Sequence, residues 1–149
     1  MKYEDTAKGF LRQIRKLDAL IKNKIAEREQ WKAIALGTSM QLNERVQFHG
    51  NQQKMAHAVE KYIDIEKEID QCIDDLIAKK QEVISVIEQL KASEYDILHK
   101  VYVQNLTLEE AAYSCDKSYS WSTSIHGRAL KNLQNILDER KEVTNETSK

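Results

Sequence analysis

Hydroxyl side chains cluster near the C-terminus, where they offer hydrogen-bonding chemistry suited to a nucleic acid. Residues 118–124 read Ser-Tyr-Ser-Trp-Ser-Thr-Ser, and the cations Arg128 and Lys131 follow. Hydroxyl groups donate to and accept from phosphates and base edges. Arg128 and Lys131 could reach backbone phosphates from further along the same helix. This segment is therefore the first candidate for a functional site.

Patterns typical of enzymes are missing from the sequence. It contains no glycine-rich phosphate loop, no nucleophile elbow and no HExxH motif. The four histidines have no metal-ligand spacing: His49, His57, His99 and His126. Carboxylates such as Asp70, Asp74 and Asp75 are better interpreted as solvated charges on a helix than as a catalytic pair. We therefore predict that the chain is not an enzyme and has no catalytic, cofactor-binding or metal-binding residues.

Short helices must position the hydroxyl-rich segment. Thr107-Leu-Glu-Glu110 is a capping box that begins a short helix, and Ala111 and Ala112 supply the small residues that crossing helices need. Ser118 or Ser120 can cap a last helix that runs to Leu137. A preceding helix opens at Ser93-Glu94 and ends at Asn105-Leu106. A short helix, a tight turn and a second helix predict a helix-turn-helix, whose second helix reads bases through its N-terminal end.

The first 93 residues predict two long helices. Apolar residues from Thr6 to Leu36 recur every three or four positions, which indicates one helical stripe. From Asn51 to Ala92 a coiled-coil stripe runs through Met55, Val59, Tyr62, Ile69, Ile73, Leu76, Val83, Ile87 and Leu90, with polar Glu66 and Lys80 in its two gaps. Turn signals in Gly37–Gly50 predict a connecting loop. We expect an antiparallel, coiled-coil-like hairpin that mediates self-association, a dimer above all, or partner binding.

Composition and charge agree with this fold. The 149 residues include no proline and 32% charged residues, which fits long uninterrupted helices. The net charge of −1 excludes a uniformly basic nucleic-acid binder. Residues 1–36 hold nine basic and five acidic residues, and residues 37–93 hold seven and ten. The basic stripe on the first helix is either a solvated face or a phosphate-facing one.

The predicted organisation is all-α. Residues 1–93 form the helical hairpin, residues 94–137 form the helix-turn-helix, and residues 138–149 form a flexible tail. Cys72 and Cys115 lie in no CxxC pair and are expected to be reduced thiols. No secretory signal and no apolar stretch of about 20 residues occurs, so we expect a soluble, cytoplasmic protein without a membrane partner.

Several of these motifs carry a resemblance to a known family. Thr107-Leu-Glu-Glu-Ala-Ala112, Ser118 and Arg128-Ala-Leu-Lys-Asn-Leu133 resemble region 4 of sigma-70-type factors, and Ile97–Val103 resembles that region's first helix. The whole chain is similar to short phage and prophage transcriptional regulators akin to the late-gene activators of Gram-positive phages. Gln13–Asp18, Glu44–Val46, Gly50–Ala56 and His126–Leu130 support this likeness.

The resemblance implies a function and a set of contact residues. The chain would regulate transcription by binding promoter double-stranded DNA, RNA polymerase, or both. Tyr119, Ser120, Thr123 and Ser124 would read bases. The full set of candidate DNA-contacting residues is Lys117, Ser118, Tyr119, Ser120, Trp121, Thr123, Ser124, Arg128 and Lys131. Trp121 is equally interpretable as a hydrophobic wedge onto the first helix of the pair.

Two departures from the family pattern keep rival functions open. Related proteins place basic residues where this chain has hydroxyls, and Lys117 stands where an apolar residue would help to lock the turn. One rival is a DNA-packaging protein like the small terminase subunits, although those usually place the DNA-binding part first. The other is a protein-binding adaptor or inhibitor with little DNA affinity.

Overall fold

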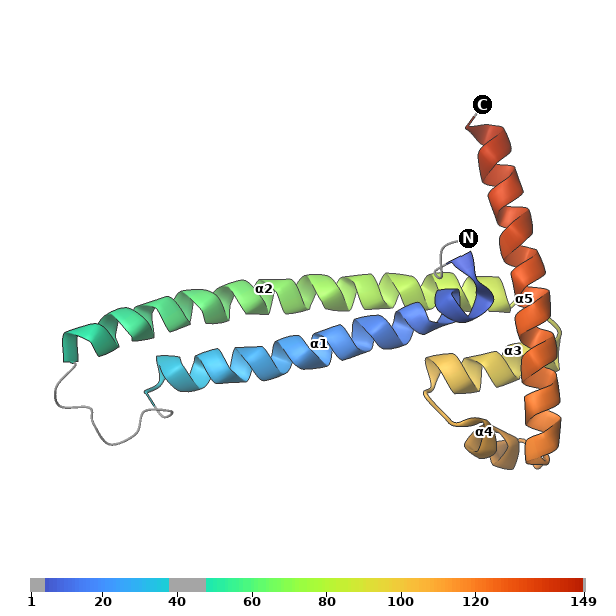
Figure 1. Ribbon diagram of the computed structural model, residues 1–149, viewed down its shortest axis with the longest axis horizontal. Coiled ribbons are helices and arrows are strands. Elements are labelled where there is room, and N and C mark those ends of the chain that lie inside the picture. Colours follow the sequence, from blue (N-terminus) through green and yellow to red (C-terminus); the bar gives the residue numbers. More distant parts are fainter. Residues whose placement is uncertain (1–4, 38–47, 149) are drawn as a thin grey trace. The chain divides into compact units, whose positions relative to one another are not determined.

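The structure is a computed structural model that describes residues 5–37 and 48–148. All secondary structure in this part of the chain is helical, as the sequence predicts (Figure 1). The elements are α1 (Ala7–Ala35), α2 (Phe48–Ile87), α3 (Ala92–Leu98), the π-helical segment η3 (His99–Val103), α4 (Leu108–Ser114) and α5 (Tyr119–Thr147). None of the described helices is long and apolar enough to cross a membrane.

The chain divides into two compact units. The core unit comprises Met1–Lys16 and Ile77–Lys149, and the hairpin unit comprises Leu17–Leu76. The boundary between the units falls within both long helices, because it follows the packing of the chain. The predicted boundary at residue 93 instead separates the long helices from the short ones. Each unit is therefore described by itself.

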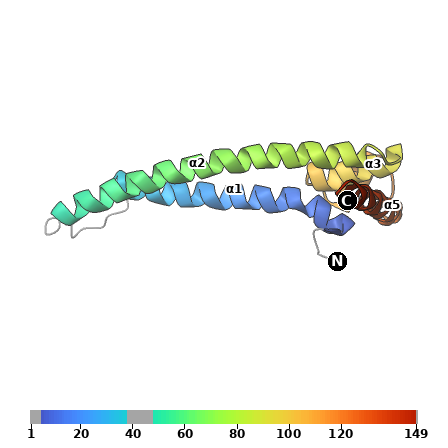
Figure 2. The same ribbon diagram turned by 90° about the horizontal axis from the view of Figure 1, so that it is seen from above.

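The hairpin unit pairs the second part of α1 with the first part of α2. Lys24 binds Glu68 at 2.8 Å and Arg28 binds Glu66 at 3.2 Å. The Trp31 and His57 rings meet edge-on with centroids 5.8 Å apart. As the residue numbers of the contacting residues increase along α1, those of their partners on α2 decrease, so the two helices are antiparallel (Figures 1 and 2). The predicted hairpin is confirmed for this unit.

The connection between the two helices is only partly described. Gly37 ends α1 with a φ of +72°, a conformation that favours glycine, so its predicted role as a turn signal is confirmed. Residues 38–47 of the predicted loop, and with them the Glu44–Val46 stretch, lie outside the described residues. Phe48, His49 and Gly50 are already helical, so α2 begins earlier than the predicted Asn51.

The buried seam of α2 differs from the predicted stripe. In the hairpin unit the buried positions are Ala58, Ile65, Ile69 and Cys72. Val59 and Ile73, which the spacing placed in the stripe, are 44% and 39% exposed. The prediction was wrong at these positions because α2 carries apolar residues on two neighbouring faces. Spacing alone mixes such faces into one stripe.

The core unit packs the start of α1 and the end of α2 with all the later elements. Thr6 caps α1 by accepting a 3.0 Å hydrogen bond from the Gly9 amide. α2 ends at Ile87 rather than at the predicted Ala92, and a turn over residues 88–90 leads into α3. The core side chains are Ala7, Phe10, Leu11, Ile14, Val83, Val86, Ile87, Ile97, Leu98, Val101, Tyr102, Ala111, Ala112, Ile125, Ala129, Leu133 and Leu137.

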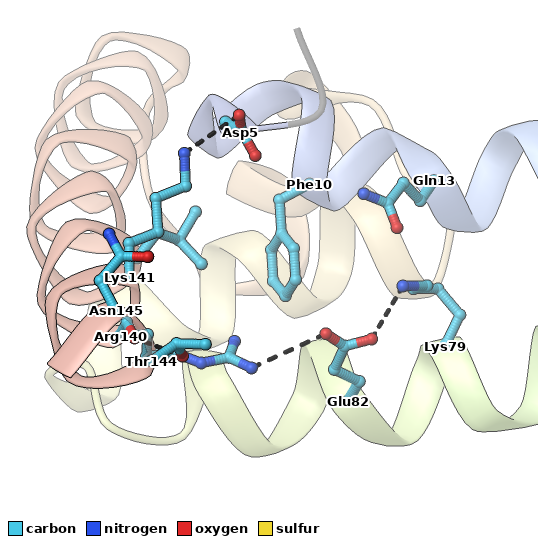
Figure 3. Close-up of a pocket in the computed structure, with 10 residues that line it drawn as sticks. Asp5, Phe10, Gln13, Lys79, Glu82, Arg140, Lys141, Thr144 and Asn145 are labelled. Carbon is cyan, nitrogen blue, oxygen red and sulfur yellow. Dashed lines mark hydrogen bonds and ion pairs between the residues drawn. The ribbon is translucent and has the colours of Figure 1, made fainter. Parts of the chain in front are cut away.

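Helix α5 is longer than the sequence predicts. Its last ten residues, 138–147, were expected to belong to a flexible tail but are helical. Lys141 binds Asp5 at 3.0 Å, and Arg140 approaches Glu82 at 3.8 Å (Figure 3). These partners come from the chain's first residues and from α2, and a reading of the local sequence could not have found them.

Candidate nucleic-acid interface

The predicted capping box begins α4. The Thr107 hydroxyl oxygen accepts a 3.1 Å hydrogen bond from the Glu110 amide. The same hydroxyl donates to Oε1 of Glu110 at 3.1 Å, so the Glu110 side chain reaches back to the cap. The Thr107 side chain thereby satisfies one backbone amide at this helix end, and the prediction of a helix start here is confirmed.

A tight turn joins α4 to α5. The Lys117 amide donates to the Ala112 carbonyl at 2.9 Å, and Asp116 adopts a φ of +55°. This pattern closes the end of α4 through the backbone. The turn therefore does not depend on an apolar side chain at Lys117. Ser118, one of the two predicted caps, accepts from the Trp121 amide at 3.1 Å and begins α5.

Small side chains let α4 and α5 pack closely. Ala111 and Ala112 are buried, as predicted, and Ala129 is fully buried on α5. Ser122 is also fully buried, and its hydroxyl donates to the Tyr119 carbonyl at 2.7 Å. One hydroxyl of the Ser-rich run is therefore used inside the protein.

The opposite face of α5 gathers most of the predicted contact residues. Ser120, Ser124, Arg128 and Lys131 are exposed, and their spacing places them along one side of the helix. Tyr119 (58% exposed) and Thr123 lie beside this line. We call the exposed side formed by these side chains the α5 face: Tyr119, Ser120, Thr123, Ser124, Arg128 and Lys131.

Three predicted residues lie at the start of α5 rather than along it. Lys117 and Ser118 are exposed in the turn. Trp121 is half-buried, and the Lys117 ammonium group lies 6.0 Å from its ring centroid. Trp121 is thus partly packed and partly exposed, between the two interpretations that the sequence left open.

Two basic residues of α1 border α5, and the sequence did not assign them to the site. The Ala7 amide donates to Oε1 of Gln134 at 2.8 Å, which fixes the start of α1 against α5. Lys8 and Arg12, both exposed, lie close enough to His126 of α5 to act on its charge. Burial, followed by the charges of Lys8 and Arg12, lowers the pKa of His126 below its ordinary value. The sequence shows the basic stripe on α1, but it does not show that Lys8 and Arg12 of this stripe lie near α5.

His126 also ties α5 to the segment behind it. Its Nε2 lies 2.8 Å from the Tyr102 hydroxyl, and the two rings stack with centroids 5.7 Å apart. Arg15 donates to the Val101 carbonyl at 3.0 Å and lies 5.6 Å from the centroid of the Tyr102 ring. Arg15 is thus engaged within the core unit, next to the neighbouring cations Lys8 and Arg12.

A polar cluster anchors the turn to α3. The Cys115 thiol donates to Asp96 at 3.3 Å, and the Lys100 ammonium group binds both Asp96 oxygens at 2.6 Å. Burial acts to raise the pKa of Asp96, but the hydrogen bonds from Lys100 and Cys115 hold it below its ordinary value. The carboxylate therefore remains charged and keeps the start of the turn close to α3.

A pocket of about 600 Å³ lies elsewhere in the core unit, between α1, α2 and α5 (Figure 3). Its charged groups pair with one another: Glu82 accepts from Lys79 at 2.8 Å and faces Arg140, and Lys141 binds Asp5. Phe10 and Leu137 also line this pocket. The arrangement joins three helices, and each of the five charged side chains in the lining is engaged in an ion pair with another of them. Among the described residues, no group of three or more His, Cys, Asp or Glu side chains is placed to hold a metal ion.

No family model, curated protein or solved structure matches this chain. The α5 face must therefore be interpreted from its own geometry and chemistry.

Proposed function

We propose that this chain is a phage-type transcriptional regulator that binds promoter DNA through α4, the turn and α5, acting as a helix-turn-helix of the sigma-70 region 4 type. In this proposal α5 enters the major groove. The observation that carries it is the line of Ser120, Ser124, Arg128 and Lys131 on the exposed side of a helix whose other side is buried. A recognition helix needs a face of this kind, rigidly held and lined with hydrogen-bonding groups.

Charge determines how strongly this face can bind. Residues 94–137 hold four basic and five acidic residues, so the module by itself adds no net attraction for phosphates. Lys8 and Arg12 act on His126, which lies on a different side of α5 from Ser124 and Arg128, so they would add longer-range attraction for phosphates to the direct contacts of Arg128 and Lys131. The hydroxyls would then contribute register and base contacts, while these four cations supply the affinity that depends on salt.

RNA polymerase is the second partner in this proposal. The resemblance to sigma region 4 supports it, because a weak DNA-binding face can act when the polymerase holds it at a promoter. A two-fold dimer would suit palindromic half-sites one helical turn apart.

Binding of duplex DNA by the full chain, measured by fluorescence anisotropy across a salt series, tests the proposal. The probes are the upstream region of the chain's own late operon and a scrambled duplex of equal length. We expect specific binding, and we expect Arg128→Ala with Lys131→Ala to reduce the salt slope by about two. Lys61→Ala with Lys67→Ala, two exposed cations in the hairpin unit, is the matched control and should leave the slope unchanged.

A second variant separates weak DNA binding from none. Ser120→Arg with Ser124→Arg adds phosphate-binding charge to the α5 face and should increase DNA affinity about tenfold or more if that face meets DNA. Absence of any specific complex, with and without RNA polymerase, together with no gain in this variant, would favour the adaptor interpretation. A ring of eight or nine subunits in light scattering would instead favour the packaging interpretation.

A further inference from the structure

An exposed stripe of apolar side chains, interrupted by Glu66 and Asp70 between Ile63 and Ile73, runs along α2 in the hairpin unit. Val59, Ile63 and Ile73 are 44%, 47% and 39% exposed. Each lies one residue after a position on the side of α2 that packs on α1, where Ala58 and Cys72 are buried and Tyr62 is half-buried. One residue corresponds to a rotation of about 100° around a helix. The stripe is therefore a second apolar face of α2, at about a right angle to the face that packs on α1.

Two such faces at a right angle are typical of a helix in a four-helix bundle, where each helix touches two neighbours. The hairpin unit supplies two helices and therefore only one neighbour for α2. A second apolar face has no use in an isolated hairpin, because exposing large apolar side chains in water is unfavourable.

The same side of the hairpin can be traced onto α1. One guanidinium group, that of Arg28, binds both Glu29 of α1 and Glu66 of α2 at 3.2 Å. Glu29 and Glu66 therefore lie on one side of the pair. Helical spacing extends this side along α1 to Lys22, Ile25 and Lys32 and along α2 to Ile63, Asp70 and Ile73. Ile25 is 36% exposed.

Charge distinguishes between the two ways in which a second copy could cover this side. Residues 17–35 of α1 hold four basic and three acidic residues, whereas residues 48–76 of α2 hold three and seven. Stacking α2 on α2 would bring two acidic helices together. Stacking α1 of one copy on α2 of the other would instead place a segment of net charge +1 against one of net charge −4, which is the less repulsive arrangement.

We infer that the Val59–Ile63–Ile73 face binds a second copy of this chain, with α1 of each copy lying antiparallel on α2 of the other in a four-helix bundle. A two-fold axis parallel to the helices produces this arrangement. Each residue and its copy in the second chain then lie at the same height along the bundle. Because Lys24 is level with Glu68, Lys22 of the second copy, which binds Asp18 of its own helix at 3.2 Å, is level with Asp70. The two faces thus combine apolar contact with an opposite charge pair.

Sedimentation equilibrium of the full chain tests the apolar part of this interface. The wild-type chain should be a dimer, and Ile63→Lys with Ile73→Lys should raise the dimer Kd about 100-fold or more. Leu20→Lys is the matched control, because Leu20 is 42% exposed but precedes the buried Ile21, which places it on the other side of the hairpin. That control should remain dimeric. Circular dichroism checks that each variant keeps its helix content.

Charge reversal tests the arrangement independently and does not disturb an apolar residue. Asp70→Lys should weaken the dimer, and adding Lys22→Asp should restore it. A stronger dimer in Asp70→Lys would show that α2 meets α2 and would overturn the arrangement. A monomeric wild-type chain would overturn the interface itself. So would a dimer that Ile63→Lys with Ile73→Lys leaves as intact as Leu20→Lys does. DNA binding at a single half-site does not depend on this result, so the proposed function and this inference can fail separately.

Discussion

Asn132 of α5 donates a 2.8 Å hydrogen bond from its Nδ2 to Oε1 of Glu94 in α3, and the Glu94 side chain is only 1% exposed. This bond links the helix that carries the candidate DNA-binding face to the helix behind it. A buried carboxylate needs hydrogen-bond partners, because water no longer solvates it. The pair therefore fixes the orientation of α5 as well as stabilising the core.

Removing the Asn132 amide should destabilise the protein. Asn132→Ala leaves the buried Glu94 without this donor, and we expect a loss of about 1–3 kcal/mol in the free energy of unfolding. Denaturant unfolding followed by circular dichroism measures the loss. Asn135→Ala, an exposed position one turn further along α5, should change the free energy by no more than about 0.5 kcal/mol. Equal effects at the two positions would contradict a structural role for the pair.

Acidification should destabilise the protein through His126. Its pKa is lowered in the folded chain by burial and by Lys8 and Arg12, so the unfolded chain binds the proton more readily. The resulting stability is fully present above the unfolded pKa of about 6.5 and is lost as the pH falls through the lower folded value. Unfolding free energies measured between about pH 8 and pH 5 should fall on the acid side.

The matched variant for this titration is His126→Gln. It removes the titrating group and should flatten the pH dependence in this range. Lys8→Ala with Arg12→Ala should raise the pKa of His126, which NMR titration of the ring can follow. An unchanged His126 pKa in that double variant would show that the two cations do not lie near α5.

Local sequence signals predicted the elements around the candidate site well. The caps at Thr107 and Ser118 depend on residues three positions away, and Ala111 and Ala112 are small where the two helices meet. Such signals act within one helix end or one turn. They can therefore be recognised without knowing which segments of the chain meet.

Contacts between distant segments could not be predicted in this way. Lys141, which lies in the last helix beyond Leu137, binds Asp5 near the other end of the chain. Val59 and Ala58 are both apolar neighbours on α2, and only the position of α1 shows which of them is buried. Likewise, nothing in the sequence places Lys8 beside His126. These features depend on tertiary packing, which the periodicity of a single segment does not determine.

The N-cap of α5 should contribute measurably to stability. Ser118→Ala removes the acceptor for the Trp121 amide and should cost about 1 kcal/mol, within a range of about 0.5–2 kcal/mol. Ser120→Ala is the control, because Ser120 was the alternative cap and its hydroxyl is not the one that accepts from this amide. Thermal and denaturant unfolding provide the comparison. A larger loss of stability for Ser120→Ala than for Ser118→Ala would contradict the assignment of Ser118 as the N-cap.

Phe10 should be among the most costly aromatic residues to truncate. Its side chain is 6% exposed and lines the junction of α1, α2 and α5 (Figure 3). Phe10→Ala should reduce the free energy of unfolding by about 3–5 kcal/mol, because it removes buried apolar surface and leaves a cavity. Tyr113→Ala removes a ring of similar size that is 86% exposed, and it should cost no more than about 0.5 kcal/mol. Similar costs at both positions would contradict the described packing of α1.

Gly127 offers a test in which stability and DNA binding should change in opposite directions. It lies within α5 among the residues of the exposed face, and a Cβ added there would meet nothing within 4 Å. Glycine inside a helix costs about 0.5–1 kcal/mol relative to alanine, so Gly127→Ala should stabilise the free protein by that amount.

The packing of α5 therefore gives no reason for a glycine at this position, whereas close approach of a ligand to the backbone would. If DNA lies on the α5 face, the added methyl group should reduce DNA affinity about tenfold, because the helix can no longer approach as closely. Asn135→Ala, about 12 Å further along the helix, should also stabilise the protein slightly but leave DNA affinity unchanged. Anisotropy titrations measure the DNA affinity of both variants, and their unfolding curves measure the change in stability. A Gly127→Ala protein that is more stable and binds DNA as tightly as the wild type would show that DNA does not contact α5 at this position.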